Sequence, residues 1–326
     1  MNHRERLESC LNGGRPDRTP VALWRHFPTD DLDPSSLVRS IVFFQQTYGF
    51  DFVKITPRSS YSTQDWGASD AWNGNPEGSG IYKQYPVTHP ENWYQLAVHS
   101  PLKGALGEQL RVIEQVRSNL PSDISIIPTI FSPLSQAKHL AGNETLLTHL
   151  RETPDALKKG LEVIVEQTIV FIRECKKRGI DGIFFAVQHA QRTLLSDDEF
   201  TQFGFEFDKK VLSEVQDLWL NVGHIHGAQI MFDIAIQYPV NILNWHDREE
   251  GIRLDYGLTH FPGAVCGGLR QWDTMAYGRP EQVRAEAADA IHQTHGTRFI
   301  LGTGCVLPII APHSNILAAI ETAAKA

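Results

Sequence analysis

Short apolar runs alternate with helical patterns along the whole chain. Eight runs rich in β-branched and aromatic residues are bounded by glycine, proline or polar residues, a pattern typical of strands. These predicted strands span residues 19–26, 50–57, 124–131, 181–188, 218–225, 240–246, 263–269 and 298–305. Several of them are apolar at nearly every position, which is typical of parallel strands buried on both faces.

Amphipathic segments between these runs predict helices with clear boundaries. In one of them Thr153 is the expected N-cap, Pro154 occupies the first turn, and Gly179 follows the last basic residues. Segments that begin at Ser196 and Arg279 start and stop in a similar way. Because strand and helix alternate eight times, we predict a closed (β/α)8 barrel, or TIM barrel. It forms a single domain over residues 1–326.

The connection from residue 58 to about residue 107 is too long for a simple loop. Its first half is rich in glycine, aromatic and polar residues without a regular period. Long loops at the carboxyl ends of barrel strands commonly carry function, so we expect this one to cover the active-site face. Tyr61 and Trp66 lie in it, either as substrate contacts or as packing residues of a lid.

Composition and charge exclude several classes of function. The net charge of −8 offers no positive field for nucleic acid or anionic lipid, and no apolar run is long enough for a membrane span. The first ten residues lack the apolar core of a signal peptide. Four widely spaced cysteines do not resemble a secreted disulfide framework. We therefore expect a cytoplasmic protein with a small-molecule substrate, and a homodimer is compatible with the sequence.

Polar residues close most of the predicted strands, at the rim where barrels carry their chemistry. His224 and His226 are separated by one residue, so their side chains point the same way, roughly 6–7 Å apart. Two imidazoles at this spacing can bind one metal ion. Cys305 closes the last predicted strand and reaches the same rim. Two histidines and a thiolate leave one tetrahedral position open, which is the arrangement of a catalytic zinc site.

Each of these residues also has an ordinary structural explanation. A pair of histidines on a strand can be a hydrogen-bonded core pair, and a lone buried cysteine can be a small hydrophobic residue. Arg25 and Arg58 can form salt bridges in the barrel or bind a substrate carboxylate; Arg25 is also a candidate catalytic residue. His189 and Asp247 can act as general bases or orient a metal-bound histidine. Two further candidates for substrate contact close predicted strands: His26 and Gln188.

Several stretches together carry a resemblance to a known superfamily. They are RERLESCLNGGRPDRTPVALWRH, FDFVKITP, HIHG, GGL and GTGCVLPIIAPHSNILAAIE. Over essentially the full chain they resemble the uroporphyrinogen decarboxylase superfamily. That superfamily also contains zinc-dependent methyltransferases that move methyl groups between corrinoid proteins and thiols. Both branches share a (β/α)8 barrel, so the resemblance implies the fold that the pattern predicts.

Particular residues favour the methyltransferase branch. In the decarboxylases two arginines after the first strand hold carboxylates, an aspartate ends the second strand, and a histidine lies in the last. Here Arg25 matches the first arginine, the second is missing, Arg58 stands near the position of the aspartate, and Cys305 replaces the histidine. In the methyltransferases a His-x-Cys pair and a distant cysteine hold zinc. His224 and Cys305 match two of these positions, and His226 replaces the middle cysteine.

The resemblance therefore implies a zinc-dependent methyltransferase with the metal on His224, His226 and Cys305. A thiol-type group is the expected acceptor, and a methylated corrinoid on a partner protein is a candidate donor. Two alternatives remain: a metal-free decarboxylase in which Arg25 and Arg58 bind carboxylates, and a barrel that binds a ligand without catalysis. We do not expect uroporphyrinogen to be decarboxylated, because a guanidinium at Arg58 cannot accept hydrogen bonds from pyrrole N–H groups.

Overall fold

The computed structural model, which describes residues 1–325, is built around a curled sheet of seven parallel strands. Each strand pairs with the next one along the sheet, in the order β1-β4-β5-β6-β7-β8-β9. The strands are β1 (Phe52–Ile55), β4 (Ser125–Phe131), β5 (Phe184–Val187), β6 (Val222–Ile225), β7 (Ile242–Trp245), β8 (Ala264–Leu269) and β9 (Phe299–Thr303). Every residue of these strands is buried, as their nearly continuous apolar sequences predict.

The first predicted strand, residues 19–26, does not become a strand of this sheet. Val21 alone forms a parallel bridge, to Leu301 of β9. On the other side its carbonyl oxygen accepts a 2.8 Å hydrogen bond from the backbone N–H of Asp51, just before β1. Pro20 has no N–H to donate, which limits regular pairing here. Residues 1–325 therefore form a seven-stranded sheet where eight strands were predicted, with this segment bridging its two edges.

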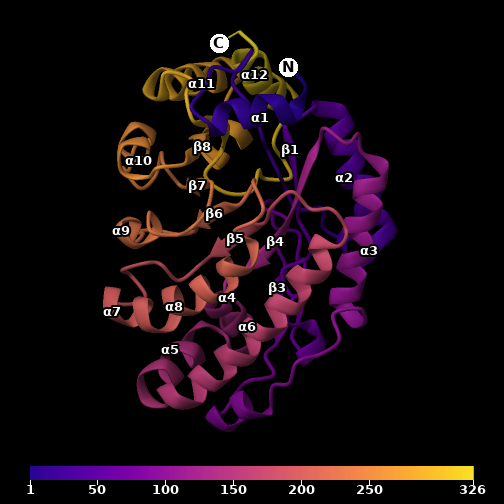
Figure 1. Cartoon of the computed structure of the whole chain (residues 1–326), viewed down its shortest axis with the longest axis vertical. Helices are drawn as coiled ribbons and strands as arrows, with labels where there is room; N and C mark the ends of the chain where they lie inside the picture. The colour runs from indigo at the N-terminus through magenta and orange to yellow at the C-terminus, as the bar shows by residue number, and fades with distance from the viewer. Residues whose placement is uncertain (326) are drawn as a thin grey trace.

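Helices cover the outer face of the sheet (Figure 1). The two termini lie at the same end of the molecule, beside α1, α11 and α12. The helices are α1 (His3–Leu11), α2 (Pro34–Tyr48), α3 (Gly104–Asn119), α4 (Pro133–Ala141), α5 (Asn143–Glu152), α6 (Pro154–Lys176), α7 (Asp197–Phe200), α8 (Glu206–Leu212), α9 (Phe232–Ala235), α10 (Leu254–His260), α11 (Pro280–Thr294) and α12 (His313–Ala323). None of the helices formed by residues 1–325 combines the length and apolar character needed to cross a bilayer.

The predicted helix boundaries are largely confirmed. α6 begins at Pro154, and Gly179 adopts a left-handed φ of 74° just beyond its end. Ser196 forms a reciprocal capping box with Glu199, as the start of a helix requires. The helix predicted from Ser196 is not continuous, because residues 201–205 form a π-helical turn between α7 and α8.

The long connection after β1 contains an antiparallel hairpin of β2 (Ser69–Ala71) and β3 (Ile81–Gln84). The turn of this hairpin packs against the segment that follows β9. Ile309 donates its backbone N–H to the carbonyl oxygen of Pro76 at 2.9 Å. Gly78, with a φ of 90°, lies so close to Ile309 that an added Cβ would come within 2.8 Å of its side chain. The hairpin therefore lies beside the carboxyl end of β9.

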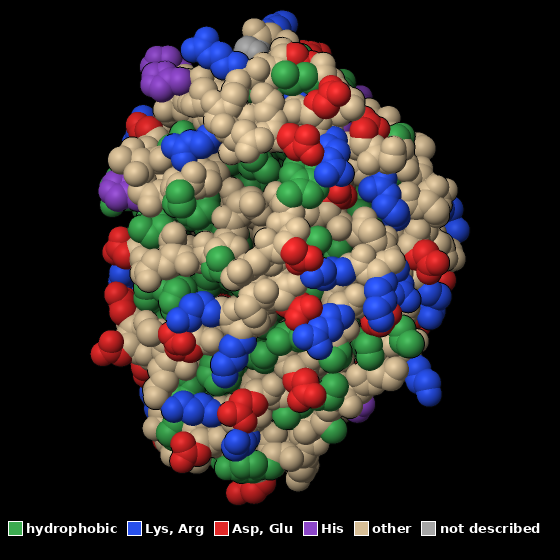
Figure 2. All heavy atoms as spheres, viewed as in Figure 1, with side chains coloured by type: hydrophobic (Ala, Val, Ile, Leu, Met, Phe, Trp, Pro, Cys, Tyr) green, Lys and Arg blue, Asp and Glu red, His purple; other side chains and the backbone are tan. Residues whose placement is uncertain are grey.

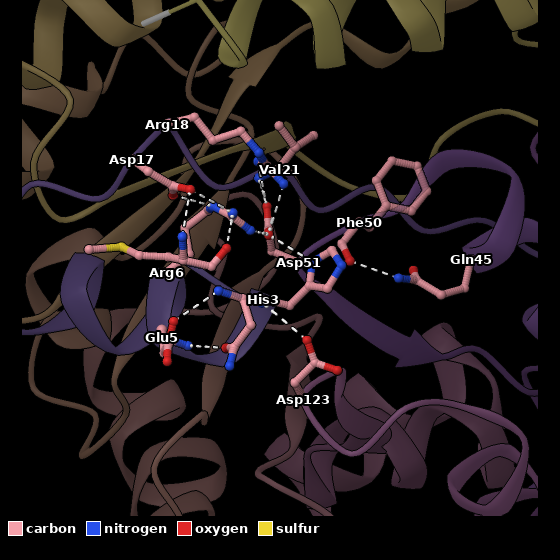
Figure 3. Close-up of polar contacts among 12 residues, drawn as sticks. His3, Glu5, Arg6, Asp17, Arg18, Val21, Gln45, Phe50, Asp51 and Asp123 are labelled. Carbon is pink, nitrogen blue, oxygen red and sulfur yellow. Dashed lines mark hydrogen bonds and ion pairs between the residues drawn. The ribbon is translucent and has the colours of Figure 1, made fainter.

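At the opposite end of the strands a buried carboxylate binds several residues from the first part of the chain. Asp51, fully buried just before β1, accepts hydrogen bonds from Arg6 at 2.7 Å and from Arg18 at 2.8 and 3.0 Å. It also accepts the backbone N–H of Val21 at 2.7 Å, and His3 Nδ1 lies 3.0 Å away. Figure 3 shows these side chains directed toward Asp51 from α1 and the segment after it. This carboxylate thus anchors α1 and the bridging segment to the sheet.

The outer surface carries no broad area of one charge on the face shown in Figure 2, where acidic and basic side chains are interspersed. This mixed distribution agrees with the modest net charge of −8.

Candidate metal centre

Three potential metal ligands meet at the carboxyl ends of β6 and β9. His224 lies on β6, His226 follows its last residue, and Cys305 follows the end of β9. Their donor atoms all lie within 4.8 Å of one another, and Cys305 Sγ is 3.7 Å from His226 Nδ1. His224 and Cys305 are buried, while His226 is half-buried. The convergence that strand alternation predicts is therefore present, although metal binding itself stays a prediction.

Asn244 on β7 fixes the orientation of His224. Its amide nitrogen donates to two backbone carbonyl oxygens, those of Cys266 at 2.9 Å and Thr303 at 3.0 Å. The amide oxygen must therefore be the atom that faces His224 Nδ1 at 2.7 Å, so Nδ1 carries the proton. The lone pair of His224 is then on Nε2, which is the form that a metal ligand requires. Asn244 was not identified from the sequence, although it is the lone polar residue within the buried strand β7.

Burial sets the protonation of the three candidate ligands. It lowers the pKa of His226 to about 4 and that of His224 well below its ordinary value, with neighbouring histidines adding to both effects. Burial also raises the pKa of the Cys305 thiol to about 12. The two imidazoles are therefore neutral and keep a lone pair, and a cation would be needed to hold Cys305 as a thiolate. This donor set fits a zinc ion.

A further histidine lies beside this cluster. His246 follows β7, and its ring centroid is 5.3 Å from that of His226. Its Nε2 atom is buried and has no hydrogen-bond partner among residues 1–325. The backbone at Gly304 lies close to the backbone of His246, and only glycine fits there, because an added Cβ would lie 2.7 Å from the Cα atom of His246. Glycine next to Cys305 thus lets the chain after β9 come close to the end of β7.

A cavity of about 240 Å³ opens beside the cluster. His224, His226 and Cys305 all line it, as do His26 and Gln188, which were predicted to contact substrate. Several polar groups that the sequence did not assign to the site also line it: Lys54, Glu77, Tyr82, Lys138 and His139. Glu77 and Tyr82 come from the hairpin connection, so the long loop contributes to the cavity wall.

The two arginines predicted to bind substrate do not line this cavity. Arg25 lies over the rings of Phe27 and Phe44, with its guanidinium carbon 5.3 and 5.7 Å from their centroids. Arg58 forms an ion pair of 2.8 Å with Asp70 in the hairpin. Arg25 therefore packs against α2, and Arg58 fastens the hairpin to the end of β1. The position of Arg58 also removes it as the group that would face pyrrole N–H donors.

Two aromatic candidates in the long loop likewise have other partners. Tyr61 is buried, and its hydroxyl donates to the backbone carbonyl oxygen of Thr129. Trp66 donates its indole N–H to the carbonyl oxygen of Ala97 at 2.8 Å. Neither side chain lines the cavity, so both act here as packing residues, which was the alternative role expected for them.

His189 and Asp247 are buried near the site but are not part of the cavity wall. His189 Nε2 lies 3.3 Å from the amide oxygen of Asn143. Asp247 accepts the backbone N–H of Gly268 at 3.0 Å, and burial raises the pKa of its carboxyl to about 7. Neither residue lines the cavity, and their catalytic roles stay predictions.

Comparison with known proteins identifies relatives of this chain. The family model described as uroporphyrinogen decarboxylase (URO-D) matches residues 74–326. A methylated-thiol–coenzyme M methyltransferase from Methanosarcina mazei is 22% identical over 244 residues. That match covers 72% of this chain and 63% of the relative. The chain therefore spans less than two thirds of the relative's length.

Solved structures show the same fold. A methyltransferase from Methanosarcina mazei superposes with a TM-score of 0.86 at 19% identity, over 100% of this chain and 99% of its own. A B12-independent methionine synthase from a Shewanella species has a TM-score of 0.58 at 13% identity, over 94% of this chain and 95% of its own. The seven-stranded sheet with its outer helices is therefore a TIM-barrel-like arrangement shared with methyltransferases.

Proposed function

The chain belongs to the uroporphyrinogen decarboxylase family, and from that premise we propose that it is a zinc-dependent methyltransferase with a small thiol as acceptor. The observation that carries this proposal is the meeting of His224, His226 and Cys305 within 4.8 Å, at one end of a cavity. Three protein ligands leave a fourth tetrahedral position for a substrate atom. The name of the Methanosarcina mazei relative, methylated-thiol–coenzyme M methyltransferase, supports methyl transfer as the reaction class.

In this proposal the chain holds the metal and excludes water. His224 Nε2, the imidazole of His226 and the sulfur of Cys305 would hold zinc, and Asn244 keeps His224 in the required tautomer. When bound, zinc supplies a Lewis acid that lowers the pKa of an incoming thiol. The buried walls then leave the acceptor sulfur poorly solvated, which favours its attack on carbon.

The methyl transfer is a displacement at carbon. The acceptor sulfur attacks the methyl carbon, a sulfur–carbon bond forms, and the bond to the donor breaks with its electron pair staying on the donor. The thiol proton passes to solvent water when the acceptor binds. We propose a methylated corrinoid carried by a partner protein as the donor, in which case the electron pair remains on cobalt.

The structure supports the rival decarboxylase less well. That reading needs Arg25 and Arg58 as carboxylate anchors, and neither of them lines the cavity. Coproporphyrinogen formed above background from uroporphyrinogen under anaerobic conditions would move the decarboxylase ahead of the methyltransferase.

Methyl transfer can be measured directly with methylcobalamin as a stand-in donor. Zinc-loaded protein is incubated anaerobically with methylcobalamin and 3-mercaptopropionate, and the thioether is quantified by mass spectrometry while the methylcobalamin absorbance is followed. We expect thioether formation that requires both zinc and Cys305. Equal rates with zinc-loaded protein, metal-depleted protein and Cys305→Ser, or no thioether above the protein-free background, would refute the proposal.

Asn244→Ala is expected to weaken zinc binding by about 10- to 100-fold, because the loss of a partner that orients a ligating histidine has this typical effect. Zinc affinity is measured by competition with a chromophoric chelator. Asn221→Ala is the matched control. Asn221 is equally buried and donates to the carbonyl oxygens of Val215 and Leu218, but it lies at the amino end of β6. An equal loss of affinity in both variants would mean that destabilisation of the sheet, not orientation of His224, causes the effect.

A further inference from the structure

A second, much smaller cavity lies between α2 and the bridging segment of residues 19–26. Its volume is about 10 Å³, which is close to the space that one water molecule needs. Apolar side chains form most of its wall. Four polar side chains also line it: Trp24, Arg25, Gln45 and Lys54. Lys54 donates to Thr56 Oγ1 at 3.1 Å, so the other three decide what the cavity binds.

Each of these three side chains has a buried polar atom without a partner. Trp24 and Gln45 are each 3% exposed. The indole Nε1 of Trp24, the Nε of Arg25 and the Oε1 of Gln45 make no hydrogen bond within residues 1–325. The amide of Gln45 cannot be reversed to change this, because its Nε2 donates to the carbonyl oxygen of Phe50 at 2.7 Å. Buried polar groups are normally hydrogen-bonded, so three such atoms around one cavity indicate a bound molecule.

The three atoms select the chemistry of that molecule. Trp24 Nε1 and Arg25 Nε carry hydrogens and can only donate, whereas Gln45 Oε1 can only accept. A metal cation would face two N–H groups, and an anion would leave the oxygen of Gln45 without a donor. A water molecule has two lone pairs and two hydrogens, so it can satisfy all three atoms at once. The volume of the cavity leaves room for one water molecule.

We propose that one water molecule binds in this cavity, accepts hydrogen bonds from Trp24 Nε1 and Arg25 Nε, and donates one to Gln45 Oε1. Gln45 lies on α2, and Trp24 lies in the bridging segment, so the water connects these two parts of the chain. Val21 forms the sole strand bridge of that segment within the described residues, so its side chains depend on contacts of this kind. The inference does not depend on which reaction the protein catalyses.

The water site also affects the larger cavity beside the metal ligands, because Trp24 lines both cavities. The ring centroid of Trp24 lies 6.1 Å from that of Phe52 and 5.1 Å from that of Phe184. These contacts hold the apolar faces and edges of the indole, while the water holds its N–H group. Gln45 is therefore a positioning residue, which acts through the water on one wall of the larger cavity.

Nuclear magnetic resonance tests whether the water is present. The protein is labelled with nitrogen-15 at the tryptophan indoles, the resonances are assigned by single Trp→Phe variants, and rotating-frame Overhauser effects to water are recorded. We expect a cross-peak from a bound water at the Trp24 indole. Trp93 and Trp245 are matched controls, because both are fully buried and donate to protein acceptors, His149 Nδ1 at 3.0 Å and the carbonyl oxygen of Ile252 at 2.9 Å.

The controls should show no such cross-peak. No cross-peak at Trp24, or cross-peaks of equal strength at all three indoles, would overturn the proposal.

Gln45→Met is expected to abolish the cross-peak at Trp24 and to lower the melting temperature by about 2 °C or more, because it leaves Trp24 and Arg25 unpaired. Gln136→Met is the control. Gln136 is a buried glutamine of α4 whose Nε2 also donates to a backbone carbonyl oxygen, that of Phe131 at 2.9 Å. It should keep the cross-peak at Trp24 even if it lowers the melting temperature. An unchanged cross-peak in Gln45→Met, or its loss in both variants, would overturn the role assigned to Gln45.

A high-resolution crystal structure of the parent protein tests the same site without any variant. We expect electron density for one water molecule at about 2.7–3.2 Å from each of Trp24 Nε1, Arg25 Nε and Gln45 Oε1. A cavity without density, or these atoms bonded to other protein groups, would contradict the proposal.

Discussion

Cys305→Ala will bind zinc about 100- to 1,000-fold more weakly than the parent protein. Structural zinc sites bind with about 10–16 kcal/mol over four ligands, or roughly 2.5–4 kcal/mol for each, and every 1.4 kcal/mol is a factor of ten. In the proposed site three side chains hold the metal, so removal of the Cys305 sulfur leaves two of them. His226→Ala is expected to have an effect of the same size.

Zinc affinity of these variants is measured by competition with a chelator, and far-UV circular dichroism checks that the fold is retained. Cys175→Ala is the control, because Cys175 is a buried cysteine of α6 that is not part of the cluster. It should bind zinc as tightly as the parent protein does. A Cys305→Ala or His226→Ala variant that keeps its full affinity would remove that residue from the site.

Asp51→Ala is expected to lower the free energy of unfolding by about 3–5 kcal/mol, the usual cost of breaking a buried ion pair. Asp51 is fully buried, so its removal leaves the guanidinium groups of Arg6 and Arg18 without their shared carboxylate. It also removes the acceptor for the N–H of Val21, which holds the bridging segment beside β1. Urea denaturation measures the loss.

Asp17→Ala is the matched control for Asp51→Ala. Asp17 also pairs with Arg6, at 2.7 Å, but its side chain is 41% exposed, so its removal should cost about 0–1 kcal/mol. Similar losses of stability in both variants would show that the buried ion pairs of Asp51 stabilise the protein no more than the exposed ion pair of Asp17.

The contacts of Asp51 also predict how the stability of the protein depends on pH. Burial alone would raise the pKa of Asp51, but the hydrogen bond to His3 and the charge of Arg18 lower it below its ordinary value. A carboxyl whose pKa is lowered by folding stabilises the protein above about pH 4, and this contribution is lost as the pH falls further. The difference in stability between the parent protein and Asp51→Ala should therefore shrink in acid. A difference that stays constant down to pH 3 would contradict this assignment.

The sequence predicts the sheet well because its strands are buried on both faces. Runs such as residues 181–188 and 298–305 have an apolar centre, and β5 and β9 lie within them. The segment at residues 19–26 has the same apolar pattern, but only Val21 forms a bridge. Hydrogen-bond pairing near Pro20 depends on the neighbouring edges, which a local pattern does not describe.

The candidate site could be predicted only where strand geometry fixes the direction of a side chain. The side chains of His224 and His226 were placed together by the alternation of a strand, and Cys305 by its position after the last strand. Arg25 lies in the predicted strand of residues 19–26, which does not form, and Arg58 lies three residues beyond β1. In the structure they face α2 and the hairpin.

Lys54 and Asn244 could have been identified from the sequence as residues with a special role. Each is a lone polar residue within a short, otherwise apolar strand, β1 and β7. A polar residue on a strand buried on both faces needs a partner inside the protein or in a ligand. Asn244 finds its partners in His224 and two backbone carbonyls. Lys54 makes one hydrogen bond, to Thr56.

The central claim is that His224, His226 and Cys305 hold zinc. The most direct measurement is the metal content of untagged protein purified without added zinc, determined by inductively coupled plasma mass spectrometry. We predict about one zinc ion per chain in the parent protein and a marked loss in Cys305→Ala prepared in the same way. A parent protein without stoichiometric metal, or a Cys305→Ala variant with the same zinc content as the parent, would contradict the account.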